Sequence, residues 1–185
     1  LWGAKGDDTL FGGKDNGNDY LSGGEGDDNL YGDHDPTWTV GAGSGDDVLL
    51  GGPGNDVLWG YGGNDKLYGG SGTAGQPYGG FDNLNGGDGN DLIEGGADGD
   101  MLTGGEGKDT FVYNTGDGSD LIYDFTHGED IIELSYDGIA NWSDLSSYIS
   151  SEADDTALIT FSEEDSIILS GVDAANLEAS DFAFA

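Results

Sequence analysis

A large apolar residue recurs at a nearly constant interval along the first 112 residues, and Gly-rich polar segments separate the repeats. The clearest example is Gly51–Tyr68, which reads GGPGNDVLW and then GYGGNDKLY. If each copy is numbered from one to nine, position six is Asp and position eight is large and apolar. Nine residues cannot bury a core alone, so we expect each copy to be one unit of a stack.

Ten copies align in this way. Their position-six residues are Asp8, Asp19, Asp28, Asp47, Asp56, Asp65, Asp82, Asp91, Asp100 and Asp109. Their position-eight residues are Leu10, Leu21, Leu30, Leu49, Leu58, Leu67, Leu84, Ile93, Leu102 and Phe111. An eleventh, weaker copy has Asp120 at position six and Ile122 at position eight. Three insertions interrupt the spacing, and we expect them to be surface loops: Lys14–Gly17, Gly32–Gly41 and about Ser71–Tyr78.

The composition of the repeat predicts a turn followed by a strand. Positions one to six are rich in Gly, which tolerates the positive φ values of tight turns. Positions seven to nine form a short strand, in which position eight points inward while seven and nine point outward. Two repeats then make one coil, and successive coils pair as two parallel sheets around a Leu-filled interior.

The composition changes after Val112, and we divide the chain into residues 1–112, the repeat region, and residues 113–185, a capping segment. The capping segment has less Gly and more Ile, Ser and Ala. Its predicted strands are Leu121–Phe125, Ile131–Leu134, Thr156–Phe161 and Ser166–Leu169. A short helix is predicted at Asn141–Ile149, with Asn141 as its N-cap. A solenoid needs such a segment to cover its last coil.

Charge and composition restrict the partners of this chain. Of its 185 residues, 38 are Asp or Glu and 4 are Lys or Arg, which gives a formal net charge of −34. A compact fold with this charge repels itself unless cations bind to it. Nucleic acid is excluded as a partner because there is no basic surface. There is no Cys, and no apolar run is long enough to span a membrane.

The repeat resembles a known calcium-binding motif. The pattern G-G-x-G-x-D-x-U-x over about Gly3–Val112 resembles the RTX (haemolysin-type) repeat family, as in the C-terminal parts of serralysin-type proteases and mannuronan epimerases. The resemblance implies an all-β, right-handed parallel β-roll of about five coils, with a β-rich C-terminal cap. Gly116–Ser135 is similar to the segment that follows the repeats in those proteins. The ending Asp181–Ala185 looks like the tail of type I secretion substrates.

The turns have the oxygen ligands that Ca²⁺ prefers, namely carboxylates and free backbone carbonyls. We therefore predict that calcium ions, up to about nine, bind between stacked turns, through the ten position-six Asp residues and Asp120. Adjacent turns in one stack are two repeats apart, so Asp56 is expected to lie near the turns of Asp28 and Asp82. The alternative is that these Asp residues only form turns, which Asp favours by itself.

Two functions remain open. The first is a module that folds on calcium outside the cell and supports type I secretion and the stability of a larger secreted protein. Leu1-Trp2-Gly3 looks like the end of an earlier repeat, so we expect an upstream domain of the same polypeptide. The second is a glycan- or protein-binding module that uses a column of outward aromatic residues: Phe11, Tyr31 and Trp59. Contact with the cap or with a neighbouring domain would equally explain that column.

Catalysis is not expected within these residues. There is no HExxH or GxSxG pattern, and the two histidines, His34 and His127, lie in unrelated segments. The segment Asp33-His34-Asp35 in the second insertion could hold a metal, but it lacks the rest of a calcium loop. A solvated polar loop is the simpler interpretation.

Overall fold

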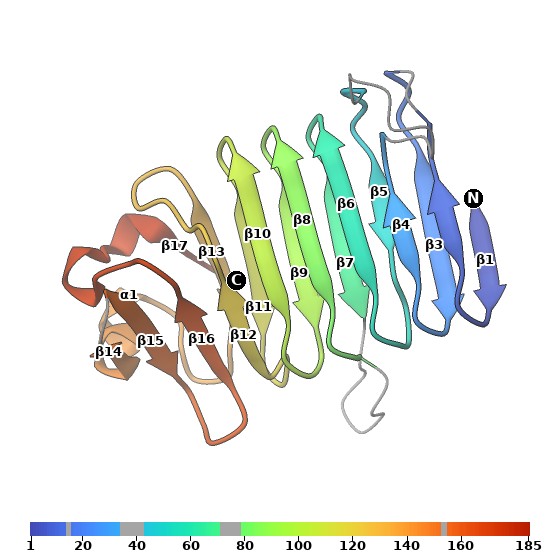
Figure 1. Cartoon of the computed structure of the whole chain (residues 1–185). Coiled ribbons are helices and arrows are strands. Elements are labelled where there is room, and N and C mark those ends of the chain that lie inside the picture. The colour runs from blue at the N-terminus through green and yellow to red at the C-terminus, as the bar shows by residue number, and fades with distance from the viewer. Residues whose placement is uncertain (14–15, 34–42, 71–78, 153–154) are drawn as a thin grey trace.

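The chain folds into two sheets whose strands alternate along the sequence, as a computed structural model shows (Figure 1). The structure describes residues 1–13, 16–33, 43–70, 79–152 and 155–185. Within them, one sheet has the order β1 (Trp2–Lys5), β3 (Tyr20–Glu25), β5 (Val48–Leu50), β7 (Lys66–Gly70), β9 (Leu92–Gly96), β11 (Thr110–Asn114), β13 (Ile131–Ser135) and β17 (Phe182–Phe184).

The other sheet begins with the repeat strands β2 (Thr9–Phe11), β4 (Asn29–Tyr31), β6 (Val57–Gly62), β8 (Asn83–Asp88), β10 (Met101–Glu106) and β12 (Ser119–Ile122). It ends with β16 (Ser166–Leu169), β15 (Thr156–Thr160) and β14 (Ile149–Glu152). All pairs between repeat strands are parallel, whereas β14, β15 and β16 pair antiparallel. The predicted parallel β-roll is confirmed.

The register places the position-eight residues in line inside the roll. Leu10 pairs with Leu30, Leu30 with Leu58 and Leu58 with Leu84. The interior Leu residues from Leu21 to Leu84 are fully buried, and Phe111 is only 1% exposed. Each strand is too short to be stable alone, so the fold depends on this continuous apolar column.

The capping segment continues both sheets beyond Val112. β12 pairs with β16, and β13 pairs with β11 on one side and β17 on the other. The predicted strand Ser166–Leu169 is confirmed. The predicted strands Ile131–Leu134 and Thr156–Phe161 each differ from the observed strand by one residue at the C-terminal end. The prediction Leu121–Phe125 is wrong at both ends, because Phe125 leaves the strand to enter the core. Since both sheets cross residue 112, the division there stays a prediction about folding units.

The predicted helix is present as α1 (Trp142–Leu145) followed by a 3₁₀ turn, η1 (Ser146–Tyr148). Asn141 is its N-cap, and its Oδ1 accepts the N–H groups of Ser143 at 2.9 Å and Asp144 at 3.3 Å. Two further 3₁₀ turns, η2 (Ala174–Asn176) and η3 (Ala179–Asp181), precede β17. The strands β14 and β17 were not predicted.

The predicted insertions fall largely outside the described residues. Lys14 and Asp15, most of Gly32–Gly41, and all of Ser71–Tyr78 belong to the parts of the chain that are not described. His34 and Asp35, of the segment that could hold a metal, lie there too. In the described ranges, no helix has the length and apolar character needed to cross a membrane.

Candidate metal-binding turns

The position-six Asp residues lie in turns at the two edges of the roll, and these turns form two stacks. The odd stack contains the turns of Asp8, Asp28, Asp56, Asp82, Asp100 and Asp120. The even stack contains those of Asp19, Asp47, Asp65, Asp91, Asp109 and Asp130. Within a stack, the backbone N–H of each Asp donates to Oδ1 of the next Asp, at 2.7–3.0 Å. Asp56 therefore lies between Asp28 and Asp82, as predicted.

The second carboxylate oxygen of these residues has no hydrogen-bond donor. Among the described residues, Oδ2 is buried and unpartnered in Asp8, Asp28, Asp47, Asp56, Asp65, Asp82, Asp91, Asp100 and Asp109. Buried polar atoms are almost always hydrogen-bonded, because the desolvation cost is otherwise uncompensated. Nine such atoms recur in the turns, and each is an oxygen that a cation could bind.

Glycine at positions one and two makes room for this arrangement. A Cβ on Gly51 would lie 2.3 Å from Asp56 Oδ2 and 2.6 Å from the carbonyl oxygen of Gly69. Gly52 has φ +118°, and a Cβ there would lie 2.3 Å from the carbonyl oxygen of Gly24. Carboxylate and carbonyl oxygens thus converge on the glycine backbone. These hard oxygen donors fit Ca²⁺.

The donors at each turn are carbonyl oxygens and only a few carboxylates. Nowhere in the described ranges do three or more Asp, Glu or His side chains gather as a ready-made metal cluster. A site in these turns therefore depends on backbone carbonyls and on two neighbouring turns. Residue type alone cannot reveal such a site.

Burial raises the pKa of these carboxyl groups. It raises the pKa of Asp56, Asp65, Asp82, Asp100 and Asp109 from 3.8 to about 7. The pKa of Asp47 and that of Asp91 rise to about 6, again because of burial. The N–H donated by the neighbouring turn lowers each pKa, and adjacent carboxylates raise it further. Without a cation, ionised carboxylates at these positions oppose the fold.

Comparison with known families identifies the repeats. Residues 2–35, 41–73 and 78–111, more than half of the chain, match the family described as RTX calcium-binding nonapeptide repeat (4 copies). The chain belongs to the RTX repeat family. It is a calcium-binding RTX repeat module of the haemolysin type. A search of curated proteins finds no match.

Solved structures that are similar to this chain include two epimerase subunits and a lipase. The R2 subunit AlgE6R2 of the mannuronan C5-epimerase of Azotobacter vinelandii is 29% identical, with 74% of this chain and 91% of that one covered and a TM-score of 0.56. AlgE6R3 of the same epimerase is 24% identical over 99% of this chain and 81% of that one, with a TM-score of 0.38. The extracellular lipase LipA of Serratia marcescens is 19% identical, with a TM-score of 0.43. The match covers 99% of this chain and 39% of the lipase.

Position five of the RTX repeat has a role that the sequence analysis missed. Asn55 Oδ1 accepts the N–H of Phe81 at 2.8 Å, and Asp27 Oδ1 accepts the N–H of Asn55 at 2.8 Å. In the even stack, Asn64 Oδ1 accepts the N–H of Asn90 at 3.0 Å. Position five therefore forms a second, exposed ladder beside the carboxylates. The sequence feature that could have predicted this ladder is the frequent Asn or Asp at position five, because these short side chains can bond to the next turn.

Asp120 differs from the other predicted RTX ligands. Its Oδ1 accepts the N–H of Asp100 at 3.0 Å, as the ladder requires. Its side chain, however, lines a small cavity together with apolar side chains, including Leu102, Ile132 and Ile167. Burial in this setting raises its pKa to about 9. Asp19 is partly exposed at the other end of the module, and its N–H donates to Asp47 Oδ1 at 2.8 Å.

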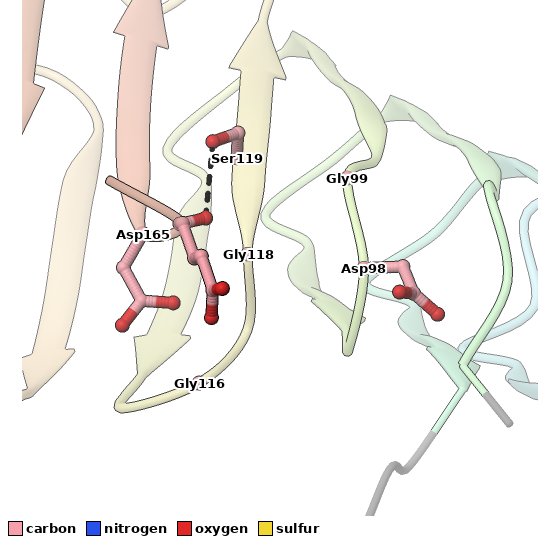
Figure 2. A pocket seen from close by; sticks show the side chains of 7 residues that line it. Asp98, Gly99, Gly116, Gly118, Ser119 and Asp165 are labelled. Carbon is pink, nitrogen blue, oxygen red and sulfur yellow. Dashed lines mark hydrogen bonds between the residues drawn. The ribbon is translucent and has the colours of Figure 1, made fainter. Parts of the chain in front are cut away.

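An acidic hollow of about 500 Å³ lies where the RTX turns meet the capping segment. It is lined by Asp98, Gly99, Gly116, Gly118, Ser119, Glu164 and Asp165. Asp98 and Asp165 lie on opposite sides of Gly118 (Figure 2). Ser119 Oγ donates to the carbonyl oxygen of Glu164 at 3.2 Å, and Tyr136 donates its hydroxyl to Asp165 Oδ2 at 2.9 Å. The hollow is therefore open to solvent but braced by the hairpin of β15 and β16.

The predicted aromatic column exists on the outer face of the RTX module. Phe11, Tyr31 and Trp59 are neighbours across β2, β4 and β6. The rings of Phe11 and Tyr31 stack at 5.0 Å with an interplanar angle of 12°. Trp59 is 36% exposed, and its ring centroid lies 6.0 Å from that of Tyr61.

Asp33, in the segment that could hold a metal, is fully buried and accepts the N–H of Gly45 through Oδ2 at 2.8 Å.

Proposed function

We propose that this chain folds when calcium binds and supports the export and stability of a larger secreted protein. The supporting observation is the set of nine buried Oδ2 atoms without a donor. In the unfolded chain water solvates these oxygens, so their desolvation counts against the fold. A ligand that binds only the native state stabilises it by mass action.

The proposed ligands are the position-six carboxylates and the carbonyl oxygens around the position-one and position-two glycines. Bound calcium would supply the positive charge that offsets the neighbouring carboxylates. The chain itself positions these ligands. The ladder of backbone N–H groups and Asp Oδ1 atoms sets the spacing of the turns, and Leu58 and its equivalents pack the strands together. Glycine keeps the space between the oxygens free of side chains.

The location of the protein is inferred from the same coupling. RTX domains are typical of secreted proteins, and extracellular calcium modules bind at about 10⁻⁴–10⁻³ M. A chain with a net charge of −34 would stay unfolded where calcium is scarce, pass through a type I exporter, and fold outside.

Circular dichroism of the purified chain tests the folding part of this proposal. We expect an unfolded spectrum in chelator, recovery of β structure on addition of calcium, and no recovery with magnesium, which demands a smaller octahedral site. A folded spectrum that does not change in chelator would contradict the proposal. For export, cells carrying a type I exporter should secrete the full chain but not a chain lacking Asp181–Ala185.

The aromatic column supports a second candidate, a calcium-scaffolded module that binds a glycan or a protein. The favouring observation is the stacked alignment of Phe11 and Tyr31 next to the partly exposed Trp59. A glycan and peptide array with wild type and Trp59→Ala tests it. Tyr20→Ala is the matched control, because Tyr20 is 57% exposed and lies on β3 in the other sheet. A specific signal lost only in Trp59→Ala would support binding.

A further inference from the structure

The last turn of each stack differs from all earlier turns at position one. In the ten earlier turns this residue is glycine, and an added Cβ would lie 2.1–2.7 Å from Oδ2 of the Asp in the same turn. These glycines are Gly3, Gly12, Gly23, Gly32, Gly51, Gly60, Gly69, Gly86, Gly95 and Gly104. In the last two turns, Tyr113 and Asp124 occupy this position, two residues after Phe111 and Ile122, as Gly104 is two residues after Leu102. Tyr113 is 2% exposed, and Phe125, which follows Asp124, is 5% exposed.

In the even stack, the final carboxylate is satisfied by the protein. Asp130 Oδ1 accepts the N–H of Asp109 at 3.0 Å, as in every other turn. Its Oδ2, however, accepts the N–H of Thr126 at 2.7 Å. In an earlier turn, such as that of Asp56, Oδ2 accepts no N–H, and the N–H of Gly52 donates instead to the carbonyl oxygen of Gly69 in the next coil, at 2.8 Å. Asp130 thus lacks the free oxygen that marks the other turns.

The neighbouring coil closes this turn with a second saturated carboxylate. Asp181 is fully buried, and it accepts N–H groups from Gly128 at 3.1 Å and Glu178 at 2.7 Å. Nδ1 of His127 lies 2.9 Å from both of its oxygens. Donors from the chain therefore surround Asp181, so it leaves no oxygen for a metal.

In the odd stack, a tyrosine closes the last turn. Tyr113 donates its hydroxyl to the carbonyl oxygen of Gly118 at 2.6 Å, which takes up one of the oxygens of that turn. Tyr113 and Asp120 line the same small cavity, whose other walls are apolar. The Asp120 carboxylate thus lies among apolar side chains, where the dehydration of a cation would be uncompensated.

The N–H groups at the end of the repeat region donate to a side chain in place of a backbone carbonyl. Asp124 accepts the N–H of Gly104 through Oδ1 and that of Gly105 through Oδ2, both at 2.9 Å. In earlier coils, carbonyl oxygens of the next turn take this role, as the bond from Gly51 N–H to Tyr68 shows at 2.9 Å. Asp124, at position one of the last even turn, thus accepts through its side chain the N–H groups that backbone carbonyls accept in earlier turns.

We infer that the chain's own donors and aromatic rings close the last turn of each stack, so that calcium binding ends at Asp100 and Asp109. Asp120 and Asp130 then hold no ion, and Tyr113, Asp124 and Thr126 are the residues that stop the series. This inference rests on the proposed calcium binding by the earlier turns. It leaves four gaps between turns in each stack, eight in all.

Native mass spectrometry of the full chain in calcium tests this inference by counting bound ions. We expect no more than eight ions on wild type, the same count on Asp120→Asn and Asp130→Asn, and at least one ion fewer on the matched variants Asp82→Asn and Asp91→Asn. Nine or more ions on wild type would overturn the inference, and this outcome does not depend on how well any variant folds. A lower count on Asp120→Asn than on wild type would overturn it for the odd stack.

The outcomes separate the two proposals. A wild-type chain that binds no calcium contradicts the proposed function. A chain that binds calcium through Asp120 or Asp130 contradicts only the closure of the last turns. Tyr113→Phe gives a further readout, because it removes the hydroxyl and keeps the ring. It should leave the ion count unchanged while lowering the thermal stability of the calcium-bound chain.

Discussion

Replacing Asp56 with Asn should change the stability of this module in opposite directions with and without calcium. Asp56 is 1% exposed, its Oδ1 accepts the N–H of Asp28 at 2.7 Å, and its Oδ2 has no donor. Asn retains the acceptor and the shape but has no charge. The substitution therefore separates the charge of the residue from its role in the turn.

The size of the effect without calcium follows from the pKa. Burial raises the pKa of Asp56 from 3.8 to about 7. Because the folded-state pKa lies above the unfolded value, this group favours the calcium-free fold at low pH and opposes it as the pH rises through about 7. A difference of about three pKa units corresponds to a cost on the order of 4 kcal/mol above that pH. Asn removes this cost.

Osmolyte-induced folding in chelator measures the effect. Trimethylamine oxide drives compaction of a chain that is unfolded on its own, and circular dichroism reports the midpoint. At neutral pH, Asp56→Asn should fold at a lower osmolyte concentration than wild type, and its midpoint should depend less on pH. In saturating calcium, the same variant should unfold at a lower urea concentration, because a ligand is lost. Asp137→Asn, which changes an exposed carboxylate, should alter neither midpoint.

Two results would refute this reasoning. If Asp56 only forms a turn, Asn, an equally good turn residue, will leave both midpoints close to wild type. If Asp56→Asn is less stable than wild type in chelator as well as in calcium, the buried charge is not what opposes the calcium-free fold.

Three further substitutions test the parts of the repeat separately. Gly51→Ala places a Cβ 2.3 Å from Asp56 Oδ2, so calcium-dependent folding followed by circular dichroism should need several-fold more calcium and stability should fall by about 1–3 kcal/mol. Leu58→Ala empties a fully buried site and should cost about 2–5 kcal/mol in urea unfolding with calcium; an effect below about 1 kcal/mol would contradict the assigned core. Asn55→Ala removes the acceptor for Phe81 N–H and should cost about 1 kcal/mol in the same assay, with an unchanged ion count.

The register of the roll could be predicted because the nine-residue repeat determines both which residues are buried and which residues form turns. Leu58 and Leu84 occupy position eight despite the insertion between them, and the structure pairs them directly. Asn141 was recognisable as an N-cap because the capping chemistry is local. These predictions needed only spacing and residue type.

Features that depend on tertiary contacts could not be predicted from the period. β17 is a three-residue strand whose sequence resembles an export tail, and only its pairing with β13 makes it part of the sheet. β14 is a polar edge strand that is defined by its antiparallel partner β15. The change from glycine to Tyr113 and Asp124 at position one was visible in the sequence. Its meaning required knowing that the position-one backbone faces the Asp carboxylate.

Binding and folding cannot be assigned to different residues in this module, because the same nine positions supply the core, the spacing and the ligands. Any substitution that lowers the intrinsic stability of the roll raises the calcium concentration needed to fold it, since binding stabilises only the native state. Leu58→Ala should therefore raise the calcium midpoint although Leu58 provides no ligand, whereas it should leave the saturated ion count unchanged. Asp82→Asn should change both quantities. Measuring the count together with the midpoint is thus the way to distinguish a ligand from a core residue, and a Leu58→Ala chain that bound fewer ions at saturation would show that the sites are not set by the turns alone.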